Sequence, residues 1–166
     1  ITNPVEETYY WEEDLYREID FNATDVDAGE ILTWDLIADA PWLSLDADTG
    51  ILSGTPTNEE VGEWLVNVTV TDDSMESDWN VFTIDVTNTN DPPTIDPVFI
   101  DEIEEDELFW YNFTAQDIDP TDDEIEWSLE TNAMFLSINS LTGNLSGTPT
   151  NNDVGEWWIN VTAFDG

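Results

Sequence analysis

The sequence contains no cysteine, histidine or lysine, and Arg17 is its only basic residue. These absences exclude a Ser-His-Asp or Cys-His relay, a disulfide, a Schiff base and a zinc site made of nitrogen and sulfur ligands. A single cation cannot neutralise a phosphate backbone, so nucleic-acid binding and docking onto an anionic membrane surface are also excluded. The chain has no long uninterrupted apolar run, so we expect no segment to span a bilayer.

Acidic residues dominate what is present. The 166 residues include 40 Asp and Glu, and the formal net charge is −39. Apolar residues nevertheless make up 40% and aromatic residues 12% of the chain, so a folded core is expected and not a disordered acidic chain. Two causes of the charge stay open: binding of hard cations by carboxylates, or an acidic surface of the halophilic kind. Bound divalent ions would stabilise the fold under either cause, because such a charge resists compaction.

The chain contains an internal repeat. The run TGILSGTPTNEEVGEW at residues 49–64 recurs as TGNLSGTPTNNDVGEW at residues 142–157. Between the copies lies NTNDPP at residues 88–93, whose prolines favour an extended linker. We therefore expect two tandem domains, residues 1–91 with the linker and residues 92–166. The chain starts with neither Met nor a signal peptide, so we expect a mature segment or one excised from a longer protein.

Each copy has the pattern of β-structure. Apolar residues alternate along residues 64–71 and along their counterparts from residue 157, and turn signals such as Asp48-Thr49-Gly50 separate such runs. The pattern predicts an all-β fold of two β-sandwiches in series. The residues expected to face the cores include Trp34, Trp64, Val66, Val68, Val70, Phe82, Ile84, Val86, Trp127, Trp157, Ile159, Val161 and Ala163. Leu65, Trp158 and Phe164 fall on outward positions, where they are candidates for a subunit interface.

Two runs carry a family resemblance. Residues 41–73, PWLSLDADTGILSGTPTNEEVGEWLVNVTVTDD, and residues 135–166, FLSINSLTGNLSGTPTNNDVGEWWINVTAFDG, resemble the dystroglycan-type cadherin-like and "putative Ig" repeats of large surface proteins. The linker NTNDPP is similar to the DxNDN junction of cadherins. The resemblance covers nearly the whole chain and implies Greek-key sandwiches of cadherin or Ig type, an extracellular location and calcium at domain junctions.

The resemblance also implies which residues bind Ca²⁺. Those ligands would come from the base of the first domain (Glu13 and Glu60), the linker (Asn88, Asn90 and Asp91) and the top of the second domain (Asp117, Asp119 and Asp165). Glu105 is the counterpart of Glu13, and the remaining candidates Asp25, Asp27 and Asp72 lie at the other end of the first domain. The sequence departs from cadherins at Asn88, where an acid is usual, and lacks a clear DRE motif. The alternative is that these are solvated turn residues, because Asp and Asn in turns bind their own backbone.

Five Asn-x-Ser/Thr sequons are candidate glycosylation sites in a host that glycosylates: Asn22, Asn67, Asn112, Asn144 and Asn160. The strand register predicts that Asn67 and Asn160 point outward. The alternative is that Asn-rich and Thr-rich strands produce sequons by chance.

The sequence therefore predicts a calcium-rigidified extracellular structural or adhesive module, part of a surface array, filament or long repeat protein, and not an enzyme. Its expected partners are other copies of itself or neighbouring domains of a longer chain, and a glycan is a further candidate. The alternative is an accessory carbohydrate-binding module of a secreted protein, marked by a row of exposed aromatic residues. A glycoside hydrolase is disfavoured, because the paired acids are expected at domain tips and not in a cleft.

The second copy also lacks a counterpart of residues 74–93, which include the alternating segment 79–87. Its sandwich should therefore be short of its final strand. Two explanations stay open: the strand lies in a continuing parent chain, or another subunit supplies it and the chain polymerises.

Overall fold

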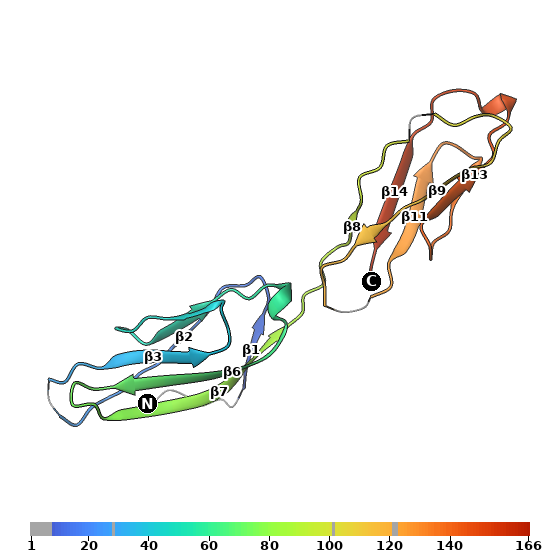
Figure 1. The fold of residues 1–166 in the computed structure, drawn as a ribbon. Coiled ribbons are helices and arrows are strands. Elements are labelled where there is room, and N and C mark those ends of the chain that lie inside the picture. The colour runs from blue at the N-terminus through green and yellow to red at the C-terminus, as the bar shows by residue number, and fades with distance from the viewer. Residues whose placement is uncertain (1–7, 28, 101, 121–122) are drawn as a thin grey trace. The chain divides into compact units, whose positions relative to one another are not determined.

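The structure is a computed structural model that describes residues 8–27, 29–100, 102–120 and 123–166. The chain divides into two compact units, Ile1–Thr89 (unit 1) and Asn90–Gly166 (unit 2). Each unit consists of strands and one short 3₁₀ helix (Figure 1). The expectation of an all-β fold of two Greek-key sandwiches is confirmed. In the described part of the chain, no helix is long and apolar enough to cross a membrane.

Unit 1 has two sheets. The first is four-stranded, in the order β1 (Thr8–Glu12), β7 (Ser77–Thr87), β6 (Gly62–Thr71) and β3 (Thr33–Ala38). The second is three-stranded, in the order β2 (Arg17–Asp20), β5 (Ile51–Gly54) and β4 (Leu43–Leu45). The β1–β7 pair is parallel, and the other pairs in this unit are antiparallel. The 3₁₀ helix η1 (Asn58–Glu60) connects β5 to β6.

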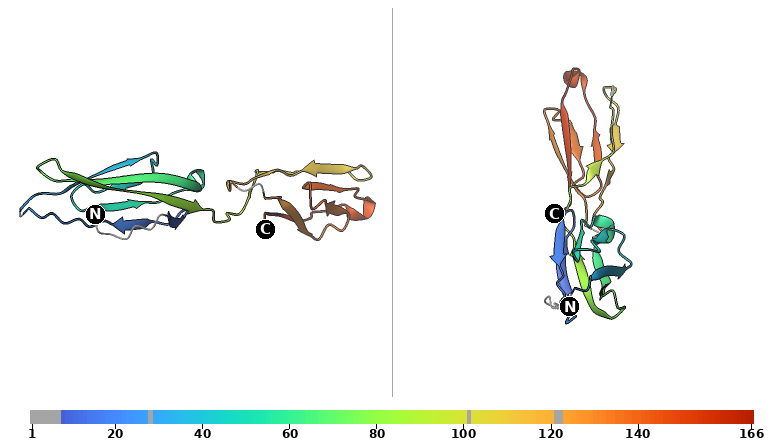
Figure 2. Two further views of the ribbon diagram at one scale, coloured as in Figure 1. Left: turned by 90° about the horizontal axis from the view of Figure 1, so that it is seen from below. Right: turned by 90° about the vertical axis from the view of Figure 1, so that its left-hand side faces the viewer.

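The period-2 alternation of the sequence produces the core of unit 1. Val66, Val68 and Val70 on β6 are buried, as are Phe82, Ile84 and Val86 on β7 and Trp34 on β3. Leu43 and Leu52 of the second sheet pack in the same cluster, so the core lies between the two sheets (Figure 2). Each such side chain contributes about 1.5–3 kcal/mol of transfer free energy when fully buried. The inward positions expected for this domain, including Phe82, Ile84 and Val86, are confirmed.

Unit 2 repeats this plan with fewer strands. One sheet has the order β12 (Leu136–Ile138), β13 (Asn144–Gly147) and β9 (Phe109–Asn112). A second pairs β11 (Glu126–Thr131) with β14 (Ile159–Phe164), and a short ribbon pairs β10 (Ala115–Gln116) with β8 (Thr94–Ile95). The helix η2 (Asn151–Asp153) precedes β14. Trp127 is buried beside Phe113, as Trp34 is beside Phe21 in unit 1.

The two units differ at the last strand. In unit 1, β6 lies between β3 and β7, whereas among the described residues of unit 2 only β11 pairs with β14. Val161 and Ala163 pack on the core as expected, but Trp157 and Ile159 remain 39% and 37% exposed. Their counterparts in unit 1, Trp64 and Val66, lie opposite Ile84 and Phe82 of β7. The described part of unit 2 has no strand in the position of β7. Trp157 and Ile159 are therefore only partly buried, as expected of a sandwich that is short of its final strand.

We predict that Gly50→Ala destabilises unit 1. Gly50 ends the turn between β4 and β5 with φ +74°, and an added Cβ would lie 2.6 Å from Cε2 of Trp34. The left-handed backbone costs about 1–2 kcal/mol for other residues, and overpacking adds about 1–3 kcal/mol. Gly29→Ala is the control, because Gly29 has φ +99° but no neighbour within 4 Å. Urea unfolding should show the larger loss for Gly50→Ala, and equal losses would show that the contact with Trp34 is unimportant.

Candidate metal centre

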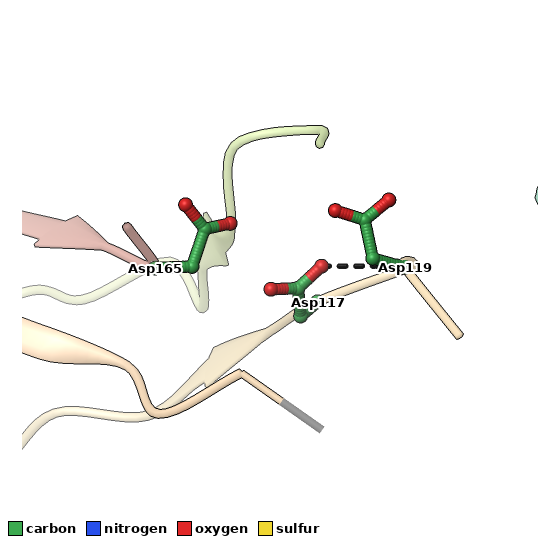
Figure 3. A group of neighbouring side chains, drawn as sticks. All are labelled: Asp117, Asp119 and Asp165. Carbon is green, nitrogen blue, oxygen red and sulfur yellow. Dashed lines mark hydrogen bonds between the residues drawn. The ribbon is translucent and has the colours of Figure 1, made fainter. Parts of the chain in front are cut away.

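Three carboxylates meet at one end of unit 2. Asp117 and Asp119 follow β10, and Asp165 follows β14 (Figure 3). One ligand oxygen from each lies within 4.8 Å of the others. Asp119 is buried with 9% of its surface exposed, and the other two are half-buried. The two segments meet because β8 and β10 pair next to the end of β14 (Figure 1).

One oxygen of each carboxylate is held by a hydrogen bond. The amide N–H of Asp119 donates to Oδ1 of Asp117 at 3.0 Å, and the amide N–H of Asp91 donates to Oδ2 of Asp119 at 2.8 Å. The side-chain Nδ2 of Asn90 donates to Oδ1 of Asp165 at 3.0 Å. These bonds fix the orientation of all three carboxylates. Outer contacts of this kind orient ligands in metal sites.

The other oxygen of each carboxylate has no such partner. Oδ2 of Asp117, Oδ1 of Asp119 and Oδ2 of Asp165 are all buried, and none has a hydrogen-bond partner in the described part of the chain. Buried polar atoms in folded proteins nearly always have a partner, because an unsatisfied one is costly. A single cation among the three carboxylates would satisfy these oxygens together.

Unit 2 has no basic side chain that could supply that cation. The one basic residue of the chain, Arg17, lies in unit 1, where its Nη2 is 3.3 Å from Oε2 of Glu12. Two unit charges 4 Å apart repel by about 1 kcal/mol in water and by about 4 kcal/mol at the effective dielectric of a protein surface. A site made only of carboxylate, amide and backbone oxygens suits a hard cation such as Ca²⁺, which takes six to eight oxygen ligands.

The linker residues predicted as ligands are part of this arrangement. Asn90 and Asp91 belong to unit 2, and both hold carboxylates of the cluster through hydrogen bonds. Both residues are predicted from the sequence as direct ligands, and the structure shows in addition that their N–H groups donate to the carboxylates. The amide N–H of Asp91 and Nδ2 of Asn90 act through contacts with residues distant in sequence, and no local pattern marks such contacts.

Glu13 and Asn88 belong to unit 1. Glu13 is almost fully buried, and its Oε1 accepts a hydrogen bond from the amide N–H of Thr89. Asn88 is half-buried, and its Oδ1 is buried without a hydrogen-bond partner in the described residues. Glu105, the counterpart of Glu13, is exposed, because no segment in the described part of unit 2 corresponds to the one that carries Thr89. The expected equivalence of Glu13 and Glu105 is therefore not seen in their surroundings.

The acids at the other end of unit 1 do not form a matching cluster. The amide N–H of Asp27 donates to Oδ1 of Asp25 at 2.7 Å, as in the Asp117–Asp119 pair. Asp25 and Asp27 are exposed, however, and Oδ1 of the buried Asp72 accepts the amide N–H of Glu76 at 2.8 Å in the turn between β6 and β7. Among the described residues, only Asp117, Asp119 and Asp165 converge. A backbone N–H in the turn after β6 donates to Asp72, and no backbone N–H in the described residues donates to Asp165.

The structure gives Glu60 a different role from the predicted one. Oε2 of Glu60 accepts hydrogen bonds from the amide and hydroxyl groups of Thr57, at 2.8 and 2.7 Å, and so caps η1. Asp153 makes the same pair of bonds with Thr150 in unit 2, and these bonds hold the pKa of Asp153 below its usual value. We therefore interpret Glu60 as a capping residue, and its predicted role as a metal ligand stays a prediction.

The sequons lie on several strands and loops. Asn22, Asn112 and Asn160 are exposed, and Asn67 and Asn144 are half-buried. Asn67 and Asn160 occupy the outward register of β6 and β14, since they alternate with the core-facing valines. Leu65, Trp158 and Phe164 are 68%, 53% and 42% exposed, as expected of outward residues.

We predict that Glu60→Ala lowers stability without changing calcium affinity. Loss of a cap costs about 0.5–2 kcal/mol. The control is Glu59→Ala, which removes an exposed carboxylate from the same helix. Urea unfolding should separate the two variants, and calcium titration should not. A calcium affinity that falls only in Glu60→Ala would show that Glu60 is a ligand.

Comparison with known proteins gives the same architecture. The family model described as Putative Ig domain matches residues 14–87 and again residues 92–166. No curated protein matches the chain. Human protocadherin-24 EC1-2 aligns with a TM-score of 0.65 at 16% identity, over 95% of this chain and 83% of that one.

Two further cadherin structures align over most of this chain. Drosophila N-cadherin EC1-4 gives a TM-score of 0.62 at 17% identity, over 94% of this chain and 46% of that one. Mouse cadherin-23 EC22-24 gives 0.55 at 19% identity, over 95% of this chain and 62% of that one. The chain therefore spans less than two thirds of these two structures. At such identities the likeness shows a shared fold.

Proposed function

Because the chain belongs to the Putative Ig domain family, with two tandem copies of cadherin-like fold, we propose that it is a calcium-binding structural or adhesive module. The proposal rests on one observation. The three carboxylates at the end of unit 2 each have a buried oxygen with no hydrogen-bond partner in the described residues, and the sole basic residue is engaged in unit 1. An external cation is the simplest partner for these oxygens.

In the proposed mechanism, the ion stiffens the segment that enters unit 2. Asp119 and Asp165 hold Asp91 and Asn90 through one oxygen each, and the ion would bind their other oxygens. An ion would remove the repulsion that otherwise pushes the three carboxylates apart. The hydrogen bonds to Asn90 and Asp91 would then persist, and the free energy of ion binding would become stiffness of the linker.

The proposed setting is extracellular, in a surface array, filament or long repeat protein. Calcium sites of modest affinity are filled where the ion is abundant, and extracellular modules bind it at about 10⁻⁴–10⁻³ M. The unpaired edge of β14 and the outward Trp158 and Phe164 support partners that add a strand, either other copies or neighbouring domains of a longer chain.

We predict that calcium stabilises unit 2 and that Asp119→Asn abolishes most of this effect. At a calcium concentration 100 times its Kd, bound ion adds about 2.7 kcal/mol, which raises Tm by about 11–22 °C for a domain of this size. Mg²⁺ should substitute poorly, because it demands a tighter octahedral shell. Calorimetric melting with calcium or with chelator measures the shift, and calcium titration should show at least about tenfold weaker binding for Asp119→Asn.

The matched control is Asp39→Asn, which removes the same charge from an exposed position outside the cluster. It should retain both the calcium affinity and the melting shift. Equal losses in Asp39→Asn and Asp119→Asn would mean that calcium acts by diffuse screening of the net charge, and the assignment of the site would be wrong.

We also predict that calcium slows hydrogen exchange at the amide of Asp91. This N–H donates to Oδ2 of Asp119, so its protection depends on how firmly that carboxylate is held. The amide of Asp27, which donates to Oδ1 of the exposed Asp25 in unit 1, is the control and should exchange at the same rate with and without calcium. Unchanged exchange at Asp91 would contradict the stiffening mechanism even if calcium binds.

A further inference from the structure

The outer face of the sheet β12-β13-β9 in unit 2 carries a shallow hollow of about 680 Å³. Six uncharged polar residues line it: Asn112, Ser137, Asn139, Thr142, Asn144 and Ser146. None of its lining residues is charged, although 40 of the 166 residues of the chain are acidic. A neutral polar face is therefore an exception on this molecule.

The strand register arranges these side chains in two rows. Asn112 lies opposite Asn144, whose carbonyl accepts the amide N–H of Asn139. In the second row, Ser146 lies between Ser137 on one side and Trp110 on the other. Trp110 is 64% exposed, so an aromatic ring stands beside the row of hydroxyl groups. Side chains directly opposite each other on such a sheet lie within about 5 Å.

Unit 1 has the same face with different chemistry. Glu18 pairs with Ser53 as Trp110 pairs with Ser146, and Asp20 pairs with Ile51 as Asn112 pairs with Asn144. Asp46 takes the place of Asn139, and its Oδ1 accepts the amide N–H groups of Asp48 and Thr49. The Thr49 hydrogen bonds hold the pKa of Asp46 below its usual value, so this carboxylate stays ionised. The three carboxylates on this face of unit 1 are thus replaced in unit 2 by one tryptophan, Trp110, and two asparagines, Asn112 and Asn139.

The asparagines of unit 2 have hydrogen-bonding groups to offer. Oδ1 of Asn139 accepts the amide N–H groups of Leu141 and Thr142, which leaves the two donors of its Nδ2. In the described part of the chain, the side chains of Asn112 and Asn144 make no hydrogen bond. The face therefore presents amide donors and acceptors together with hydroxyl groups, and one broad aromatic surface.

We propose that this face binds a neutral polysaccharide. A sugar ring would stack on Trp110, because the C–H groups of the ring complement the electron-rich aromatic face. The amides of Asn112, Asn144 and Asn139 would bond to the sugar hydroxyls, which are both donors and acceptors. The net charge of −39 repels an acidic polysaccharide.

The test uses the whole chain, made in a host that does not glycosylate proteins. Affinity electrophoresis through gels that contain laminarin, yeast mannan, galactomannan or dextran should show retarded migration in at least one neutral polysaccharide. Gels that contain alginate, which is anionic, should show none. Trp110→Ala should weaken binding by at least about tenfold. Trp79→Ala is the matched control, because Trp79 is also 64% exposed but lies in unit 1, and it should bind normally.

A second variant tests the charge argument without removing volume. Asn112→Asp combined with Asn139→Asp restores two of the three carboxylates that unit 1 carries and keeps the turn, since Asp46 forms the same turn in unit 1. This double variant should melt like the parent chain and lose binding by at least about tenfold. Asp119→Asn should leave polysaccharide binding unchanged, which separates this proposal from the calcium site.

Three results would overturn the proposal. The first is unretarded migration in all four neutral polysaccharides. The second is equal weakening by Trp110→Ala and Trp79→Ala, which would indicate non-specific contact of exposed tryptophan. The third is a glycan covalently attached to Asn112 or Asn144 when the chain is made in a glycosylating host, as detected by mass spectrometry. Such a glycan would cover the hollow and leave no room for a polysaccharide in solution.

Discussion

Repulsion among carboxylates that no basic side chain can neutralise is the constraint on which this structure depends. The net charge is −39, so each compact unit must stay folded despite the repulsion among its own carboxylates. Each does so mainly by burying aromatic and branched side chains between its sheets. Most acids stay on exposed faces, where water screens them. The few that are buried are therefore informative. Glu13, Asp72 and Asp119 each lie where backbone N–H groups hold the carboxylate.

The same repulsion explains the chemistry of the candidate metal centre. A buried cluster of acids in an ordinary protein can be balanced by a lysine or an arginine, but here Arg17 is bound to Glu12 in the other unit. The hydrogen bonds from Asn90 and Asp91 orient two of the carboxylates but carry no full positive charge. The proposed cation from solution would complete such a site, and an oxygen-only ligand set suits calcium.

The two units share one fold but differ in the side chains that one face of the fold presents. Both units have the same turn, after β4 in unit 1 and after β12 in unit 2, with Asp46 or Asn139 accepting two amide N–H groups. The backbone needs only a side-chain oxygen at this position, so its charge is free to vary. Trp110 stands where unit 1 has Glu18, and the sheet is unaffected because both side chains point away from the core. The scaffold is thereby kept while one face becomes neutral and aromatic.

The sequence by itself determined the fold class, the repeat and most of the core, because a period of two places Val66, Val68 and Val70 on one face of a strand regardless of its neighbours. Asp117, Asp119 and Asp165 were predicted as ligands from the cadherin resemblance, and the structure brings their carboxylates together. The roles of particular acids depended on tertiary contacts. Glu60 caps η1, and Asp72 is held in the turn after β6. The exposure of Trp157 follows from the edge of β14 that no described strand pairs with, and the neutral face of unit 2 appears only when three strands are set side by side. Spacing along a chain fixes which face a side chain occupies, whereas its partners come from segments far away in sequence.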